Sequence, residues 1–186
     1  MKRFFDLLIS LILLLALSIP LLIVVILIFF TSKGPILHWS QRVGRANVLF
    51  YMPKFRTMVI NTPDVATHLL ENPSSYYTPM GEFLRKYSID ELPQIYSIII
   101  GHMSLVGPRP ALYNQEDLIS MRTKEGIDRL LPGVTGLAQI SGRDELSIEK
   151  KVEIDKDYLY RKSFLFDLYI IWLTVRKVLK RDNISH

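Results

Sequence analysis

The chain has 186 residues, with 23 Lys and Arg against 18 Asp and Glu, which gives a formal net charge of +5. This length suffices for one domain with a hydrophobic core, and the positive balance favours an anionic partner such as phosphate, an acidic membrane surface or nucleic acid. There are no cysteines, which excludes disulfides and thiolate chemistry, and the four histidines lack the spacing of a zinc site.

An apolar segment near the N-terminus indicates contact with a membrane. Residues 7–30 are apolar except for Ser10 and Ser18. As a helix that rises about 1.5 Å per residue, the segment would be roughly 36 Å long, which exceeds the roughly 30 Å hydrocarbon core of a bilayer. No small-residue cleavage pattern follows it, so a signal peptide is a poor interpretation. Hydropathy alone favours an ordinary transmembrane helix.

Two features of this segment favour a hairpin that enters and leaves the membrane on one side. Lys2 and Arg3 precede it and Lys33 follows it, so the positive-inside rule places both ends in the cytoplasm. Pro20 lies near the middle, where it removes a backbone hydrogen bond and favours a bend, and the Ser18 hydroxyl could satisfy backbone groups freed there. These residues leave a kinked spanning helix open as the alternative.

The rest of the chain predicts an α+β domain that is mostly helical. Residues 38–43 and 48–55 are expected to form a β-hairpin around a turn that begins at Gly44. Residues 61–78 are rich in Pro, Asn, Ser and Thr and predict an exposed excursion, with a short helix near residues 65–71. Helices are predicted at residues 79–87, 93–100, 114–125, 148–161 and 165–180.

The last of these predicted helices has a mixed character. Residues 165–180 are largely apolar, include Tyr169 and Trp172, and end in a run of basic side chains. Such a segment either packs in the core or lies as an interfacial amphipathic helix, with its aromatic and basic side chains at headgroup level. The sequence leaves both possibilities open.

The segment from Ser88 to Gln94 is the strongest candidate for catalysis. In one interpretation Ser88 and Glu91 form a capping box at the start of a helix. Pro93 argues against it, because Pro prefers the first helical position, so the carboxylates of Asp90 and Glu91 could lie in a turn just before the helix. In either case the amide groups of a helix entrance are expected to keep both carboxylates ionised. Ionised carboxylates can bind Mg²⁺ or attack phosphorus as nucleophiles.

An anionic substrate would require cations near such a carboxylate pair. Arg85, Arg109 and Arg143 are the candidates, because guanidinium groups bind phosphate in a bidentate manner, although each could equally be a solvated surface charge. Arg109 has the best local case, since two prolines stiffen residues 107–110. Residues 131–143 contain three glycines and several polar side chains that could cradle a nucleotide, and a tight structural connection would explain the same pattern.

The order of these segments resembles the bacterial sugar transferase family, the monotopic phosphoglycosyl transferases that begin the assembly of surface glycans and glycoproteins. The short length is similar to the minimal members, which carry the catalytic domain alone, such as the enzyme that initiates bacterial N-linked glycan assembly. The matching segments are collinear and cover nearly the whole chain: Lys2-Arg3-Phe4-Phe5-Asp6, Lys54-Phe55-Arg56-Thr57-Met58, Ser88 to Gln94, Met103 to Pro110, Pro132 to Arg143, and Ser163 to Leu168.

The resemblance implies an arrangement in the membrane. Residues 1–32 would form a re-entrant helix-break-helix broken at Ser18 and Pro20. Residues 33–186 would form the catalytic domain on the cytoplasmic face of the bacterial inner membrane. Membrane lipids and downstream glycosyltransferases are the further partners that it implies, and nucleic acid is not expected as a partner.

The resemblance also implies a reaction. A sugar 1-phosphate would pass from a UDP-sugar, with an N-acetylated or modified hexosamine favoured, to undecaprenyl phosphate, with release of UMP. Asp90 would be the nucleophile of a covalent phosphosugar intermediate and would bind the Mg²⁺ cofactor, and Glu91 would assist. The substrates would contact residues of the matching segments and of the helix before Ser88: Lys54, Arg56, Arg85, Arg109, Gly136, Gln139 and Arg143.

Four positions depart from the family pattern, none of them in the Asp90-Glu91 pair. His102 matters most, because a missing carboxylate near the site could alter metal binding or sugar preference. The departures are Ile19 for serine, Val43 for proline, His102 for an acidic residue and Leu137 for an aromatic one.

Two alternatives to this function remain. One is an ordinary glycosyltransferase whose D-x-D metal motif would be Asp155-Lys156-Asp157, although such charged helical stretches are usually solvated. The other is a non-catalytic membrane-anchored scaffold or lipid-binding module. Turnover of a sugar nucleotide that depends on Asp90 would distinguish the enzyme from the module.

Overall fold

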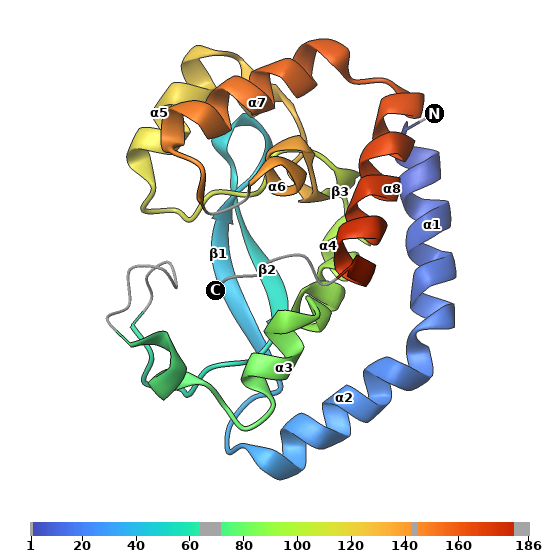
Figure 1. The fold of residues 1–186 in the computed structure, drawn as a ribbon, viewed down its shortest axis with the longest axis vertical. Helices are drawn as coiled ribbons and strands as arrows, with labels where there is room; N and C mark the ends of the chain where they lie inside the picture. Colours follow the sequence, from blue (N-terminus) through green and yellow to red (C-terminus); the bar gives the residue numbers. More distant parts are fainter. Residues whose placement is uncertain (1, 64–71, 143–144, 181–186) are drawn as a thin grey trace.

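The computed structural model describes residues 2–63, 72–142 and 145–180. Helices surround a long β-hairpin, and a second, smaller pair of strands lies beside it (Figure 1), so the predicted α+β class with mostly helical content is confirmed. The elements in chain order are α1 Lys2–Ala16, α2 Ser18–Thr31, β1 Leu37–Val43, η1 Arg45–Asn47, β2 Leu49–Phe55, η3 Pro73–Tyr76, α3 Gly81–Lys86, η4 Ile89–Gln94, α4 Ile95–Ile99, β3 Ser104–Val106, α5 Glu116–Lys124, η5 Ile127–Arg129, β4 Gly133–Thr135, α6 Leu137–Ser141, α7 Ile148–Arg161 and α8 Phe164–Lys180.

The predicted hairpin is confirmed. Strands β1 and β2 are antiparallel, with Leu37 opposite Phe55 and Val43 opposite Leu49. The turn contains a short 3-10 segment in which Ala46 and Asn47 adopt positive φ values of 53° and 59°. Phe50 and Met52 of β2 are buried in the main core. The hairpin therefore presents one side to the core along its length.

A parallel pair of short strands was not predicted. Ser104 of β3 lies opposite Gly133 of β4, and Val106 lies opposite Thr135. A side chain at Gly133 would place its Cβ 2.1 Å from the Gly107 nitrogen, so the close approach of the two chains requires glycine. This pair brings the loop that carries Arg109 next to the glycine-rich segment.

The predicted helices agree with the structure to different degrees. Helix α7 has the predicted bounds 148–161, and α8 begins one residue before the predicted residue 165. The helix predicted at residues 93–100 is observed as α4, Ile95–Ile99, and the 3-10 turn η4 leads directly into it, so its first predicted residues lie in η4. The short helix predicted near residues 65–71 lies outside the described residues.

The N-terminal apolar segment forms two helices bent by 62°. The break lies at Leu17 rather than at Pro20, because the proline ring lacks an N–H and clashes with the carbonyl four residues earlier. The Ser18 hydroxyl donates to the Leu15 carbonyl at 2.8 Å, which confirms its expected capping role. Within the described residues no single helix is long and apolar enough to span a membrane, whereas this bent pair meets that test jointly.

The beginning of α1 is held against the rest of the protein by charged side chains. The Arg3 guanidinium donates to the Ile98 and Ile99 carbonyls at the end of α4, at 2.5 and 2.9 Å. Buried Asp6 accepts hydrogen bonds from the Ser104 hydroxyl at 2.9 Å and from the Leu105 amide at 3.2 Å. The Lys2-Arg3-x-x-Asp6 sequence therefore attaches α1 to α4 and β3.

The end of α2 is attached to the same domain. The Arg56 guanidinium donates to the Pro35 carbonyl at 2.6 Å and to the Ser32 carbonyl and hydroxyl at 3.1 and 2.9 Å. Ile28 is 1% exposed and packs with Phe55 and with Leu84 of α3. Both ends of the bent pair are thus fixed to one body, and the outer faces of α1 and α2 remain apolar and exposed.

Helix α8 packs one face in the core and leaves another face exposed. Ile170 is fully buried in the main core, whereas Leu165, Tyr169 and Trp172 are exposed. Figure 1 shows α8 alongside α1, and the Phe5 and Phe164 rings meet edge to face with centroids 5.0 Å apart. The start of α8 therefore packs against α1.

Candidate active site

Asp90 and Glu91 lie in η4, a 3-10 turn packed against β2. Ser88 precedes the turn in the left-handed conformation, with φ of 54°. Among the described residues its side chain caps no amide, so the capping-box interpretation is wrong. Pro93 lies inside the 3-10 turn, where the chain needs no α-helical hydrogen bond from it. Both carboxylates therefore lie just before α4, as the position of Pro93 indicated.

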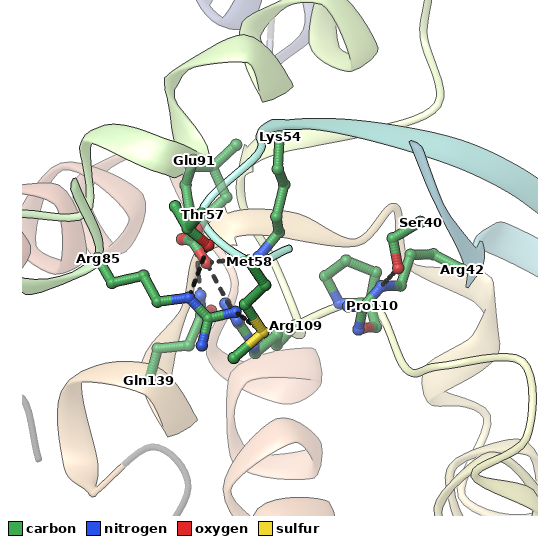
Figure 2. Close-up of polar contacts among 11 residues, drawn as sticks. Ser40, Arg42, Lys54, Thr57, Met58, Arg85, Glu91, Arg109, Pro110 and Gln139 are labelled. Carbon is green, nitrogen blue, oxygen red and sulfur yellow. Dashed lines mark hydrogen bonds and ion pairs between the residues drawn. The ribbon is translucent and has the colours of Figure 1, made fainter. Parts of the chain in front are cut away.

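Glu91 is held between two cations that come from distant parts of the chain. The Lys54 ammonium and the Arg109 guanidinium each lie 3.0 Å from Oε1 of Glu91. Figure 2 shows both side chains converging on this carboxylate. Since the Glu91 side chain is only 11% exposed, these ion pairs are shielded from water and orient it firmly.

Arg85 approaches the same place from α3. Its Nε donates to the Thr57 hydroxyl at 2.9 Å, and an Nη lies 3.5 Å from the Met58 sulfur. Thr57 and Met58 belong to the Lys54-to-Met58 segment, which begins at the end of β2 and continues past it, so that segment orients Arg85 as well as supplying Lys54 (Figure 2).

A cavity of about 800 Å³ opens at these residues. Five candidate site residues named from the sequence line it: Asp90, Glu91, Lys54, Arg85 and Arg109. Three further cations of its lining could not be predicted from local patterns, because they come from separate elements: Arg42, Arg122 and Lys151. Basic side chains thus outnumber the two acidic ones among the charged groups that line the cavity.

The other four predicted substrate contacts do not share one outcome. Arg56 borders the cavity, but its guanidinium binds backbone between α2 and β1. Gly136 is not among the described residues that line the cavity, and a Cβ there would lie 2.1 Å from the Gly107 oxygen, so packing explains this glycine. Gln139 lines the cavity and donates to the Val134 carbonyl at 2.8 Å. Arg143 lies outside the described residues.

Burial alters the protonation of the site. Burial raises the pKa of Asp90, and neighbouring Glu91 adds to the rise, whereas Lys54, Arg85 and Arg109 oppose it. The pKa of Lys54 is lowered by burial, against the attraction of Glu91. A helix entrance was expected to favour the ionised form of Asp90. The pKa is instead raised, because loss of hydration outweighs the favourable charges.

The Asp155-Lys156-Asp157 sequence is not a metal motif. Asp155 is 1% exposed and pairs with Arg122 at 2.5 Å, while Asp157 pairs with Arg161 on the surface of α7. In the part of the chain that the structure describes, no group of three or more His, Cys, Asp or Glu side chains could hold a metal ion.

His102, the departure expected to affect the site, lies apart from the described lining of the cavity. Its ring packs against Phe50 with centroids 5.4 Å apart. Its direct neighbour is thus a core residue of the hairpin.

Comparison of the sequence with models of known protein families identifies its family. The model of the bacterial sugar transferases matches residues 1–181. The chain belongs to the bacterial sugar transferase family. Two relatives of similar length are an uncharacterized sugar transferase, EpsL, of Bacillus subtilis, 39% identical over all of this chain and 90% of that protein, and the exopolysaccharide production protein ExoY of Sinorhizobium fredii, 38% identical over 95% of this chain and 84% of that protein.

A longer relative has an activity in its name. The undecaprenyl-phosphate galactose phosphotransferase of Salmonella typhimurium is 36% identical over 98% of this chain. The match covers 41% of that protein, so this sugar transferase chain corresponds to one portion of it.

The raised pKa of Asp90 predicts a stabilising substitution. A raised pKa means that the folded protein holds this proton more firmly than the unfolded chain does, so the ionised side chain lowers stability at a pH above the folded value. Asp90→Asn should therefore raise the free energy of unfolding near about pH 8. The difference from wild type should shrink as the pH falls toward the unfolded value of about 3.9.

Thermal unfolding in detergent across this pH range measures the effect. Asp157→Asn is the matched control, because its side chain is 46% exposed and its removal should change little. An Asp90→Asn protein that is less stable than wild type near about pH 8 would show that the surrounding cations outweigh burial.

Proposed function

We propose that this protein transfers a sugar 1-phosphate from a UDP-sugar to undecaprenyl phosphate. The observation that carries the proposal is the Asp90 carboxylate on the wall of a basic cavity, next to Glu91, which Lys54 and Arg109 hold in place. Phosphoryl transfer requires positioning and neutralisation of charge more than proton transfer, and this cavity provides both. The names of relatives, including an undecaprenyl-phosphate glucose phosphotransferase of Komagataeibacter xylinus, support the same reaction class.

Asp90 acts as the nucleophile in this proposal. One carboxylate oxygen attacks the sugar-bearing phosphorus, an oxygen–phosphorus bond forms, and the bond to the UMP oxygen breaks with its electron pair. A phosphate oxygen of undecaprenyl phosphate then attacks the same phosphorus and releases the Asp90 carboxylate. The products are UMP and undecaprenyl-diphosphate-sugar, and neither step requires an external proton donor.

The neighbouring side chains have separate tasks. Lys54, Arg85 and Arg109 lower the energy of the ionised Asp90 and attract the diphosphate. Glu91 keeps Lys54 and Arg109 in place, because it accepts from both. Asp90 would bind Mg²⁺ together with substrate phosphates, and the ion would supply further neutralisation of phosphate charge. The oxygen ligand offered by Asp90 fits this ion, which usually takes only one or two carboxylates beside phosphates.

The sugar and the pathway are finer parts of the proposal. An N-acetylated or modified hexosamine is the proposed sugar, while galactose and glucose appear in the names of relatives. A first membrane step in surface glycan or glycoprotein synthesis would pass its product to downstream glycosyltransferases. ExoY, named for exopolysaccharide production, supports the polysaccharide branch of this proposal.

The α1–α2 pair is proposed to enter and leave the membrane on the cytoplasmic face. Two observations support it: the 62° bend, and the attachment of both ends to one domain by Arg3 and Arg56. The exposed apolar faces of α1, α2 and α8 would then lie in lipid. This arrangement keeps the acceptor phosphate, whose isoprenoid tail stays in the bilayer, within reach of the cavity. The alternative, a non-catalytic membrane-anchored scaffold, would make Asp90 dispensable.

Release of UMP tests the reaction. Purified protein in detergent with Mg²⁺, undecaprenyl phosphate and a panel of UDP-sugars, acetamido sugars, glucose and galactose included, should release UMP with one of them. Asp90→Asn should reduce the rate by at least roughly 10³-fold, as loss of a nucleophile commonly does. Glu91→Gln should reduce it less, because the nucleophile remains. Asp157→Asn is the control with unchanged activity, and full activity of Asp90→Asn would contradict the assignment.

Thiol labelling tests the membrane arrangement. The chain has no cysteines, so a cysteine added ahead of Met1 and the variant Lys33→Cys each carry a unique label site. A membrane-impermeant reagent should label neither in intact cells and both after the inner membrane is permeabilised. Glu153→Cys, on the exposed side of α7, reports the domain side. Labelling of only one of the two ends in intact cells would mean that the pair crosses the membrane.

A further inference from the structure

The backbone that carries Arg109 makes hydrogen bonds through successive carbonyl groups. Pro108 and Pro110 have no N–H to donate, so beyond the Gly107 amide, which donates to the Thr135 carbonyl at 2.9 Å, this stretch, residues 107–111, is attached mainly through its carbonyls. The Pro108 and Ala111 carbonyls accept from backbone amides, those of Gly133 at 2.9 Å and Val43 at 3.0 Å. We call residues 107–111 the Arg109 loop.

The two central carbonyls of the Arg109 loop accept from arginine side chains. The Arg109 carbonyl accepts from Nη1 of Arg122 at 2.8 Å. The Pro110 carbonyl accepts from Nη1 of Arg42 at 3.3 Å, a longer and weaker contact. The backbone of Arg109 itself is therefore attached through Arg122.

Arg122 is in turn held by a buried carboxylate. Its Nε and Nη2 donate to Oδ2 of Asp155 at 3.0 and 2.5 Å, which joins α5 to α7. Asp155 is 1% exposed and the Arg122 side chain is 11% exposed. Three donors of one guanidinium are thus committed, two to Asp155 and one to the Arg109 carbonyl.

Stability alone does not explain this pair. Burying two charges costs hydration, and apolar residues of similar size usually stabilise a core as well or better. Asp157, two residues along the same helix, pairs with Arg161 at the surface and is not among the described residues that line the cavity. What distinguishes the Asp155 pair is its third hydrogen bond, to the residue that holds Glu91 beside Asp90.

We propose that Arg122 and Asp155 are positioning residues that hold the Arg109 loop so that the Arg109 guanidinium lies on Glu91. Asp155 orients Arg122, Arg122 fixes the Arg109 backbone, and Arg109 binds Glu91 next to the nucleophile. The inference rests on the proposed function for its effect on turnover, but its structural part can be measured without substrate.

A direct role of Arg122 in substrate binding is the competing explanation, since Arg122 lines the cavity. A substitution of Asp155 distinguishes the two explanations, because Asp155 is not among the described residues that line the cavity. Asp155→Asn keeps the Arg122 side chain present but removes the charge that orients it. Loss of orientation should affect turnover, whereas loss of a binding group should affect the affinity for the UDP-sugar.

The kinetic test uses Asp155→Asn alone and together with Arg109→Lys. Asp155→Asn should lower kcat for UMP release by roughly 10- to 100-fold, the scale of a small misplacement of catalytic groups, with KM changed by less than about threefold. Added to Arg109→Lys it should cost little more, because the two substitutions disturb the same group. Additive losses, or a raised KM with unchanged kcat, would overturn the proposal.

Hydrogen–deuterium exchange of the peptide that spans the Arg109 loop provides the readout without substrate. Exchange there should rise in Asp155→Asn and stay at the wild-type level in Asp157→Asn. An unchanged peptide in Asp155→Asn would overturn the proposal even if activity fell. If wild-type protein releases no UMP from any UDP-sugar, the proposed function fails, and exchange still decides whether Asp155 positions the loop.

A paired substitution guards against simple unfolding. Arg122→Met with Asp155→Leu removes both charges and leaves apolar groups of similar size, so the protein should fold. It should nevertheless lose turnover and show faster exchange in the Arg109 loop, because no donor reaches the Arg109 carbonyl. A folded, fully active paired variant would contradict a positioning role, and if the paired variant fails to fold, the single Asp155→Asn variant decides alone.

Discussion

Attachment of both ends of the N-terminal helix pair to one body is the constraint on which the rest of the arrangement depends. Arg3 binds the carbonyl end of α4, and Arg56 binds the backbone that follows α2. Helix α4 continues directly from η4, which carries Asp90. The apolar pair, the hairpin and the Asp90 carboxylate therefore occupy fixed positions relative to one another. A lipid-borne phosphate beside this helix pair would meet a cavity whose distance from the apolar surface is set by these contacts.

In the cavity, burial disfavours the ionised form of Asp90, whereas nearby cations favour it. Burial raises the pKa of Asp90, and the nearby cations, Lys54, Arg85 and Arg109, lessen that rise. Those cations are themselves positioned: Glu91 holds two of them and Thr57 holds the third. A site of this kind gives up stability in order to place a carboxylate and several cations before any substrate binds, which lowers the cost of reorganisation during the reaction.

Local patterns predicted the elements of this fold better than their connections. The hairpin and α7 follow from periodicity and turn residues, and both agree with the structure. Strands β3 and β4 are three residues each and pair across a long separation, so no periodic signal marks them. The Asp90-Glu91 pair was predicted from its segment, but the roles of Arg56 and Asp155 depend on partners far away in sequence. The spacing of residues along the chain does not predict such contacts.

The central claim is that Asp90 takes the phosphosugar onto its own carboxylate. The most direct measurement is mass spectrometry of intact and digested protein after incubation with the reactive UDP-sugar and Mg²⁺ in the absence of undecaprenyl phosphate. The account predicts a mass increase of one phosphosugar on the peptide that contains Asp90, which disappears when undecaprenyl phosphate is added. Two results would contradict this claim. One is an unmodified Asp90 peptide in protein that still releases UMP when the lipid is added, and the other is an adduct on another residue.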